Sequence, residues 1–242
     1  MFEVKSTFHI TKWCADKTHW TDLFCPVVYS GYVGDPEKIP FYYNVSIGHS
    51  AITDLTIEKD ALFEAMRKDT RSGIKKAIKA GCEFSVVESL EEYADFHNEF
   101  CKGKGLDLFT NADKLRRYKK TIVTKSSLDG VTLAMMISVL DDESKTAISL
   151  LSSTCRFAEG VDLRMVGNAN RLVRLRTLEM LKDMGYLKYD WGGICTDPND
   201  PRYSIAEYKL SFGGKVFENR TLRSPLYSFL EKARNVVRKI CG

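Results

Sequence analysis

Two neighbouring β-rich runs constrain the fold of this chain more than any other feature. Residues 131–142 (VTLAMMISVLDD) and 145–154 (KTAISLLSST) are rich in aliphatic and β-branched side chains, and the polar residues DDES separate them. A short polar turn between two such runs predicts a β-hairpin. We therefore expect this hairpin at the centre of a sheet.

The remaining segments alternate between helical and strand patterns. Residues 1–57 predict two or three short strands around the turn 34–40, and Ser89 with Glu92 forms a capping box that opens a helix over 90–105. The other predicted elements are a helix over 58–81, kinked or divided at Ser72-Gly73, a strand 83–89, a helix 111–126, a helix from about Asn170 to Met184, a strand 186–191, a helix 201–212, a strand 215–222 and a helix 224–240.

This order indicates a mixed α/β fold. The elements follow one another as helices, a hairpin, a helix, a strand, a helix and a strand. Such an order lacks regular βαβ alternation, which disfavours a doubly wound parallel sheet. A chain of 242 residues buries one sizeable core. A ligand crevice is expected between strand 145–154 and the strand that carries Tyr189 and Trp191.

Composition gives the cellular expectations. Hydrophobic residues make up 44% and charged residues 28%, as in an ordinary soluble globular protein. No window approaches eighteen consecutive apolar residues, and the first residues lack the pattern of a secretory signal, so a cytoplasmic protein without a membrane span is expected. The seven cysteines include no C-x-x-C pair and the four histidines are dispersed, so we expect reduced thiols and no metal site.

Basic residues cluster although the net charge is only +4. In 67–81 the cations recur every three or four residues, which places them on one helical face, and 114–125 is denser still. Such a face is either a solvated helix surface or a surface for a phosphorylated or anionic substrate.

Two adjacent glycines, Gly192 and Gly193, stand in 189-YDWGGI-194, where a short apolar strand should be tightly packed. Glycine weakens a strand, so its presence indicates either close approach of another backbone or ligand, or a bulge that needs positive φ.

The segment 164-RMVGNA-169 is similar to the Q/R-x-x-G-x-G/A signature of the GNAT superfamily of acyl-CoA N-acyltransferases. The resemblance implies a GNAT-like, largely antiparallel mixed sheet flanked by helices. It also implies an acyl-CoA co-substrate, whose pyrophosphate would be held by backbone N–H groups at a helix start. The implied cofactor-binding residues are Arg164, Gly167, Asn168 and Ala169.

Residues from about 60 to 220 also resemble the Fem-type branch, which includes aminoacyltransferases that build peptidoglycan cross-bridges. The matching segments are 71-RSGIKKAIKAG-81, 185-GYLKYDWGGI-194 and 207-EYKLSFGG-214. The resemblance implies a GNAT-like domain over 58–242. Residues 1–57 would complete its sheet, form a lid or belong to a partial second GNAT-like unit.

The resemblance assigns roles to individual residues. Asp190 would orient or deprotonate the acceptor amine, unless it only caps a turn or pairs with a lysine. Lys209 would stabilise developing negative charge or hold a phosphate, and Tyr208 or Tyr203 would protonate the leaving thiolate.

Substrate binding is assigned to the other matched residues. They are Arg71, which would hold a substrate phosphate or form an ion pair between helix and sheet, and Trp191, Gly192 and Gly193.

Three functions stay open. The first is an N-acyltransferase, with acetyl as the favoured acyl group, that uses acyl-CoA to modify an amino sugar or another cell-envelope precursor. The second is an aminoacyl-tRNA-dependent transferase acting on a peptidoglycan precursor, with tRNA bound through the basic helices. The third is a catalytically silent GNAT-like binding module.

Overall fold

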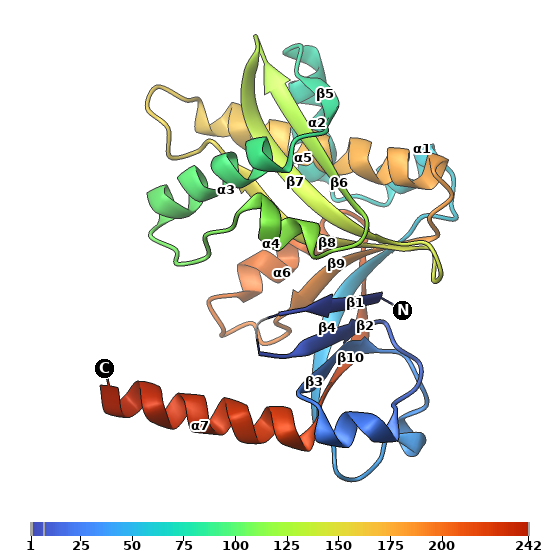
Figure 1. Cartoon of the computed structure of the whole chain (residues 1–242). Coiled ribbons are helices and arrows are strands. Elements are labelled where there is room, and N and C mark those ends of the chain that lie inside the picture. Colours follow the sequence, from blue (N-terminus) through green and yellow to red (C-terminus); the bar gives the residue numbers. More distant parts are fainter. Residues whose placement is uncertain (1, 7, 242) are drawn as a thin grey trace. The chain divides into compact units, whose positions relative to one another are not determined.

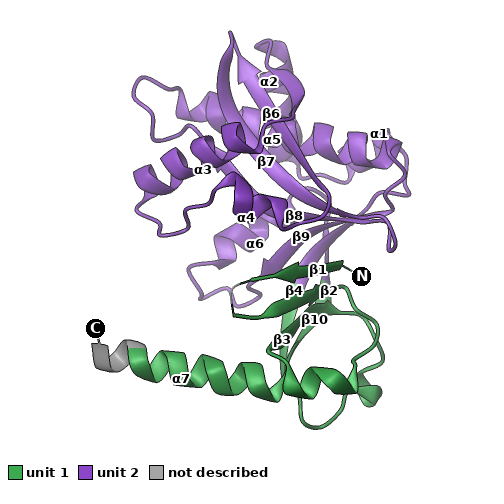
Figure 2. Cartoon of the chain, viewed as in Figure 1, with its two compact units in different colours: residues 1–49, 217–242 green, residues 50–216 purple. Residues whose placement is uncertain are grey.

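The computed structural model describes residues 2–6 and 8–241, and its side chains through residue 237. Two compact units divide the chain: residues 1–49 with 217–242 form unit 1, and residues 50–216 form unit 2 (Figure 2). Two strands, β4 (Asn44–Asp54) and β10 (Lys215–Arg223), cross the boundary between the units along the chain. The expected functional division into 1–57 and 58–242 stays a prediction.

Unit 2 is built on a mixed, mostly antiparallel sheet with the strand order β4-β9-β8-β7-β6-β5 (Figure 1). The pairs β5/β6, β6/β7 and β7/β8 are antiparallel, and β8/β9 is parallel. The strands are β5 (Glu83–Val87), β6 (Thr121–Leu128), β7 (Val131–Asp141), β8 (Thr146–Thr154) and β9 (Lys188–Ile194). The predicted central hairpin is confirmed as β7 and β8.

The hairpin strand β7 is buried on both faces because helices cover both sides of the sheet. Ala134 and Met136 pack into one apolar cluster, whereas Met135 and Ile137 pack into another. Successive side chains of a strand point to opposite faces, so this alternation divides the core into two layers.

Five helices of unit 2 supply these two layers. The first cluster receives side chains from α1 (Lys59–Glu64), α2 (Lys68–Lys79) and α5 (Leu163–Asp183), which lie behind the sheet in Figure 1. The second receives side chains from α3 (Leu90–Lys104) and α4 (Ala112–Arg116), in front of the sheet. The Ser89 cap of α3 is confirmed, since the Ser89 hydroxyl accepts the Glu92 N–H.

The expected helix over 58–81 is divided, but the predicted break at Ser72-Gly73 is wrong. The chain leaves helical geometry between α1 and α2, where buried Met66 precedes Arg67, whose N–H donates to the Ser211 carbonyl at 2.9 Å. Gly73 lies inside α2 for a different reason. A Cβ there would lie 2.8 Å from Arg171 Cδ, so the glycine permits close packing of α2 against α5.

Two other boundaries differ from the sequence-based prediction. The expected helix 111–126 is wrong in its second half, because Thr121–Leu128 pairs with strands on both sides and its β-branched run suits a sheet. The expected helix from Asn170 begins earlier, at Leu163, where the Asp162 carboxylate caps it. The segment RMVGNA therefore lies within α5 and not before it.

Unit 1 has the strand order β1-β2-β3-β10-β4. Strands β1 (Phe2–Lys5) and β2 (Ile10–Trp13) are antiparallel, β2 pairs in parallel with β3 (Val27–Tyr32), and β3 is antiparallel to β10. The 3-10 helices η1 (Trp20–Phe24) and η2 (Pro36–Lys38) lie in its loops, and α7 (Pro225–Cys241) follows β10.

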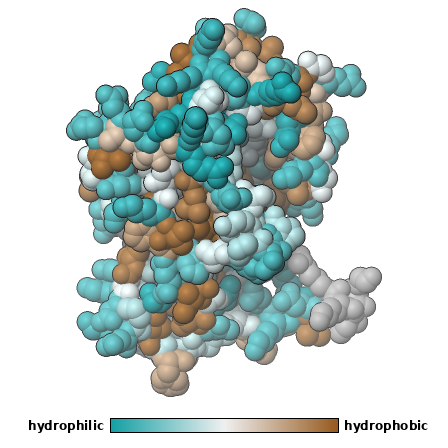
Figure 3. All heavy atoms as spheres, turned by 180° about the vertical axis from the view of Figure 1, so that it is seen from behind, coloured by the Kyte–Doolittle hydropathy of each residue, from teal (hydrophilic) through white to brown (hydrophobic). Residues whose placement is uncertain are grey.

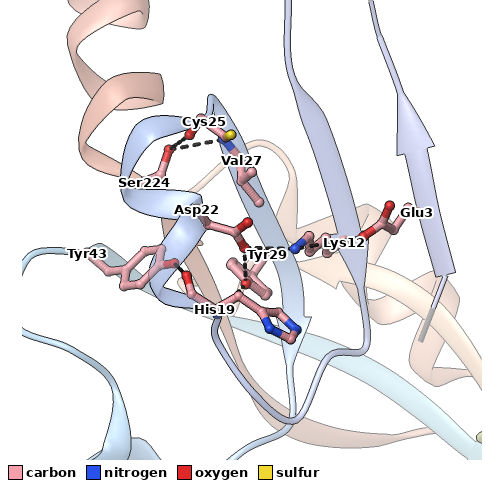
Figure 4. Close-up of polar contacts among 9 residues, drawn as sticks. All are labelled: Glu3, Lys12, His19, Asp22, Cys25, Val27, Tyr29, Tyr43 and Ser224. Carbon is pink, nitrogen blue, oxygen red and sulfur yellow. Dashed lines mark hydrogen bonds and ion pairs between the residues drawn. The ribbon is translucent and has the colours of Figure 1, made fainter.

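A buried polar network holds the core of unit 1 (Figure 4). The Lys12 ammonium donates to Asp22 Oδ2 at 2.8 Å, and the Tyr29 hydroxyl donates to the same oxygen. Both members of the ion pair are less than a tenth exposed. Removal of Lys12 would leave the Asp22 charge buried and without its ion-pair partner. The network therefore favours one arrangement of β2, η1 and β3.

Candidate functional site

The strands β8 and β9 separate inside unit 2. They pair over Thr146↔Lys188, Ala147↔Tyr189 and Ile148↔Asp190, and no further pair follows although both strands continue. Beyond this point the facing strand edges are free of one another, which leaves backbone N–H and C=O groups available to a ligand. The separation occurs where the sequence predicted a crevice, between 150–154 and the strand carrying Trp191.

Gly192 lies just after the last paired residue of β9. Its φ is +77°, a conformation that residues with a Cβ rarely adopt. A Cβ at this position would lie 3.8 Å from Lys209 Nζ and 3.9 Å from the Ser149 carbonyl oxygen, both ordinary contacts. The positive φ, and not a lack of space for a side chain, is therefore the reason for a glycine at position 192. A positive φ is what the bulge alternative required. Close approach of a ligand here stays a prediction.

Asp190 is half-buried at the point of separation. Its Oδ1 accepts the Gly192 N–H at 2.7 Å. Burial raises the pKa of this carboxyl, while the Gly192 hydrogen bond and the charge of Lys209 oppose the rise. A carboxylate with a raised pKa accepts a proton more readily than an exposed one, so Asp190 is chemically suited to take a proton from an amine.

Lys209 reaches the same strand from α6 (Tyr203–Leu210). Its Nζ donates to the Gly193 carbonyl at 2.8 Å. Burial lowers the pKa of this ammonium, the charge of Arg174 lowers it further, and Asp190 raises it. Asp190, Lys209 and the two glycines, which the sequence predicted as site residues, therefore lie together.

Arg174 is a buried cation that the sequence analysis missed. Its guanidinium carbon lies 5.4 Å from the ring centre of Trp191, 5.2 Å from Tyr208 and 5.7 Å from Phe212. Nη2 donates to the Ser152 hydroxyl of β8 at 2.9 Å, and buried Nε has no hydrogen-bond partner.

Within the described residues, no carboxylate forms an ion pair with this guanidinium. The sequence does contain a pattern that could have identified Arg174 as buried. Arg174 precedes the buried Leu178 by four residues and the buried Leu181 by seven, so it lies on the apolar stripe of α5. Arg174 thus places a positive charge beside the separated strands.

The candidate proton donors differ in their surroundings. The Tyr208 hydroxyl accepts a hydrogen bond from Asn170 Nδ2 at 2.9 Å, and its ring packs edge-on against Phe212. Tyr203 begins α6 and is half-buried. Tyr208 lies close to Arg174 and precedes Lys209, so it belongs to this cluster, while its role as a proton donor stays a prediction.

Trp191 is part of the core. Its side chain is 2% exposed, its Nε1 donates to Thr53 Oγ1 at 2.8 Å, and its ring stacks on Phe212. These contacts of the indole hold β9 against β4 and against the turn that follows α6. A direct contact of Trp191 with substrate stays a prediction.

The RMVGNA residues occupy the first turns of α5. Arg164 is exposed and its N–H donates to Asp162 Oδ1 at 2.8 Å, whereas Ala169 is fully buried. Gly167 offers its carbonyl to Arg171 Nη1 at 3.2 Å, and Asn168 lies against α2 near Gly73. The helix start that would hold a pyrophosphate therefore carries a carboxylate, which opposes a second anion.

Arg71 lies on α2, where Nη1 donates to Glu64 Oε2 at 2.7 Å. Because Glu64 belongs to helix α1 and not to the sheet, this pair differs from the helix–sheet ion pair that the sequence left open. Arg71 also lines a surface hollow with cations of the same helix, namely Lys68, Lys75, Lys76 and Lys79. Hydrophilic side chains predominate on this side of unit 2 in the upper part of Figure 3. Phosphate binding by Arg71 stays a prediction.

Buried His97 contacts the end of β8 from the opposite face of the sheet. Its Nε2 donates to the Leu108 carbonyl at 3.0 Å, so its Nδ1 accepts from the Ser153 hydroxyl at 2.7 Å. Burial lowers the pKa of this histidine. The hydrogen bond of His97 to the Leu108 carbonyl therefore fixes the loop around Leu108.

Among the residues described, no cluster of His, Cys, Asp and Glu has the arrangement of a metal site, and the six cysteines with described side chains form no disulfide. No helix within that part of the chain has the length and apolar character to cross a membrane.

Sequence comparison finds no relatives: no protein-family model matches the chain, and no curated protein matches it.

Structure comparison does find similar folds. FemX superimposes with a TM-score of 0.63 at 12% identity, over 84% of this chain and 68% of FemX. L-PGS from Bacillus licheniformis gives 0.57 at 12% identity, over 92% of this chain and 80% of L-PGS. The C-terminal domain (DUF2156) of a putative lysylphosphatidylglycerol synthetase from Agrobacterium fabrum gives 0.57 at 13%, over 82% and 68%.

Identities this low show the fold alone. Together with the mostly antiparallel sheet flanked by helices, they show that the chain has a GNAT-like fold of the form found in FemX.

Proposed function

We propose that this chain is an acyltransferase that moves an acyl group from an activated donor to an amine. The observation that carries the proposal is the separation of β8 and β9 at Ile148 and Asp190, where the half-buried Asp190 carboxylate and the Lys209 ammonium lie. A free strand edge donates N–H groups to an acyl carbonyl, and such donors stabilise the oxyanion that forms during acyl transfer.

The chemistry needs no covalent enzyme intermediate. The amine nitrogen attacks the acyl carbonyl, a C–N bond forms, and the bond from the carbonyl carbon to the leaving sulfur or oxygen breaks. Asp190 takes the proton that the amine loses, because its raised pKa suits a base. Lys209 stabilises the oxyanion, and Tyr208 supplies a proton to the leaving group.

Acyl-CoA is the first candidate donor. Its pyrophosphate would bind near the start of α5, with Arg164 as the accessible cation and Gly167, Asn168 and Ala169 forming the helix turn below it. An amino sugar or another cell-envelope precursor with a free amine is the corresponding acceptor class.

An aminoacyl-tRNA is the second candidate donor, and one observation favours it. The Asp162 carboxylate already accepts the N–H of Arg164, the second residue of α5. An anion at this helix start repels a pyrophosphate, whereas an aminoacyl ester does not need that position. The fold shared with FemX and with lysylphosphatidylglycerol synthetase domains agrees with this alternative. Its acceptor would be a peptidoglycan precursor or another amine of the envelope.

Calorimetric titration of acetyl-CoA tests the first donor. Micromolar binding corresponds to about −8 kcal/mol and should fall in Arg164→Ala but not in Arg176→Ala, an exposed arginine farther along α5. Equal affinity of the two variants would remove Arg164 from the site. Absence of acetyl-CoA binding, with binding of aminoacyl-tRNA that weakens as salt increases, would select the second donor.

A transfer assay tests the reaction itself. With the donor that binds and an amino-sugar or amino-acid amine as acceptor, Asp190→Asn should lose on the order of a hundredfold or more in rate. Asp197→Asn, in an exposed loop, is the matched control. If neither donor gives amine-dependent transfer, the chain is the silent binding module.

A further inference from the structure

Contacts of its first two turns anchor helix α7 to unit 1, including an ion pair of Glu231 Oε2 with Arg223 Nε at 4.0 Å. The Ser224 hydroxyl accepts the Tyr227 N–H at 3.2 Å and donates to the Cys25 carbonyl at 2.6 Å, while the Tyr227 ring packs edge-on against His9 at 5.1 Å. Beyond these residues the helix extends away from the body of unit 1 (Figures 1 and 2). Unit 1 therefore leaves most of this helix uncovered.

The uncovered part of α7 carries an apolar face. Phe229 is 68% exposed, Val236 55% and Val237 57%, and Leu230 is also exposed. The spacings of one, seven and eight residues place all four side chains on the same side of an α-helix. Water contact with such a continuous face is unfavourable, which indicates a partner.

Two cations border this apolar face. At 100° per residue, Lys232 and Arg234 lie about 100° to either side of its centre, and the acidic Glu231 lies about 160° away, on the opposite side. Both cations are exposed. Basic side chains at the two borders of an apolar face are typical of helices that lie in a lipid interface, where the cations contact anionic headgroups.

We propose that α7 binds the surface of an anionic lipid bilayer, with Phe229, Leu230, Val236 and Val237 inserted below the headgroups. Charge complementarity selects this partner over a second copy of the chain. In a helix pair that buries the same face, the bordering Lys232 and Arg234 would meet cations of the other copy, and like charges along such borders are destabilising. The proposal does not depend on the acyl-transfer proposal.

Sedimentation of the full chain with vesicles tests this directly. We expect binding to vesicles of equal parts phosphatidylglycerol and phosphatidylcholine, and little binding to phosphatidylcholine alone. Phe229→Asp should reduce the partition coefficient at least about tenfold, because it removes the largest inserted side chain. Replacing Lys232 and Arg234 together by Gln should reduce it about fivefold for each charge removed.

Phe41→Asp is the matched control. Phe41 is a 98% exposed phenylalanine elsewhere in unit 1, so its variant carries the same change in charge and hydrophobicity. Circular dichroism of each variant checks folding, and Val237→Asp provides a second substitution on the face.

Three results of the vesicle assay would overturn the proposal. They are no binding to either vesicle, equal binding to both vesicles, and an equal loss in Phe41→Asp and Phe229→Asp. A dimer in light scattering that Phe229→Asp converts to monomer would assign the face to a second copy instead.

Discussion

The variant Gly192→Ala tests how much stability the protein loses when a residue with a Cβ takes the positive φ at position 192, where β8 and β9 separate. An L-residue in the left-handed region destabilises the folded state by about 1–2 kcal/mol. Replacing glycine by alanine also restricts the unfolded chain, which stabilises the folded state by about 0.4–1 kcal/mol. The added Cβ meets nothing closer than 3.8 Å, so no clash contributes. We therefore expect a net loss of about 1 kcal/mol in the free energy of unfolding.

Gly167→Ala is the matched control because Gly167 lies inside α5, outside the set of positive-φ glycines. A Cβ there would lie 3.5 Å from Arg171 Nη1, an ordinary contact. Alanine is more favourable than glycine by about 1 kcal/mol within a helix. The two glycine-to-alanine variants should therefore change stability in opposite directions.

Urea unfolding followed by far-UV circular dichroism measures both variants. For a slope of about 1–3 kcal/mol per M, a change of 1 kcal/mol moves the midpoint by about 0.3–1 M. Near-UV circular dichroism should give the same midpoints, which checks that one transition is observed although the chain has two units. A midpoint for Gly192→Ala at or above that of the wild type would refute the argument from φ.

Three further perturbations test the site. Burial raises the pKa of Asp190 in the folded state above the ordinary carboxyl value of 3.8, so the wild type loses stability as pH rises from 3.8 to that raised pKa. Asp190→Asn does not titrate, and it should therefore become more stable relative to the wild type over this pH range. A difference in Tm between the two proteins that stays constant with pH would contradict this. Thr53→Val should cost about 1–3 kcal/mol in urea unfolding, since the buried Trp191 N–H loses its acceptor, whereas Thr53→Ser should cost less. Arg174→Met should raise the pKa of Lys209, because the Arg174 charge lowers that pKa and is second only to burial among the causes. Chemical acetylation of Lys209, followed by mass spectrometry as a function of pH, should then have its midpoint at a higher pH. An unchanged profile would show that the Arg174 charge does not affect Lys209.

Local patterns were enough where an element depends on its own residues. The hairpin of β7 and β8 follows from two β-rich runs and a polar turn, and α3 follows from the Ser89 cap. The proximity of Asp190 to the double glycine is also local, because the carboxylate binds the Gly192 N–H two residues away. These contacts form within a few residues, so they leave a readable pattern in the sequence.

Tertiary structure decided the rest because the deciding contacts join distant residues. Thr121–Leu128 is a strand and not a helix because two strands pair with it. Arg174 is buried because Ser152 and three aromatic rings from β9 and from α6 with its C-terminal turn surround it, and Lys209 reaches Gly193 from α6. The sequence by itself determined most of the elements, among them the hairpin of β7 and β8 and the start of α3, and it marked Gly192 as a position with a backbone or close-approach requirement. Only long-range packing brought Lys209 to the Asp190 carboxylate and buried Arg174 among the aromatic rings, since burial and charge placement are properties of the assembled core.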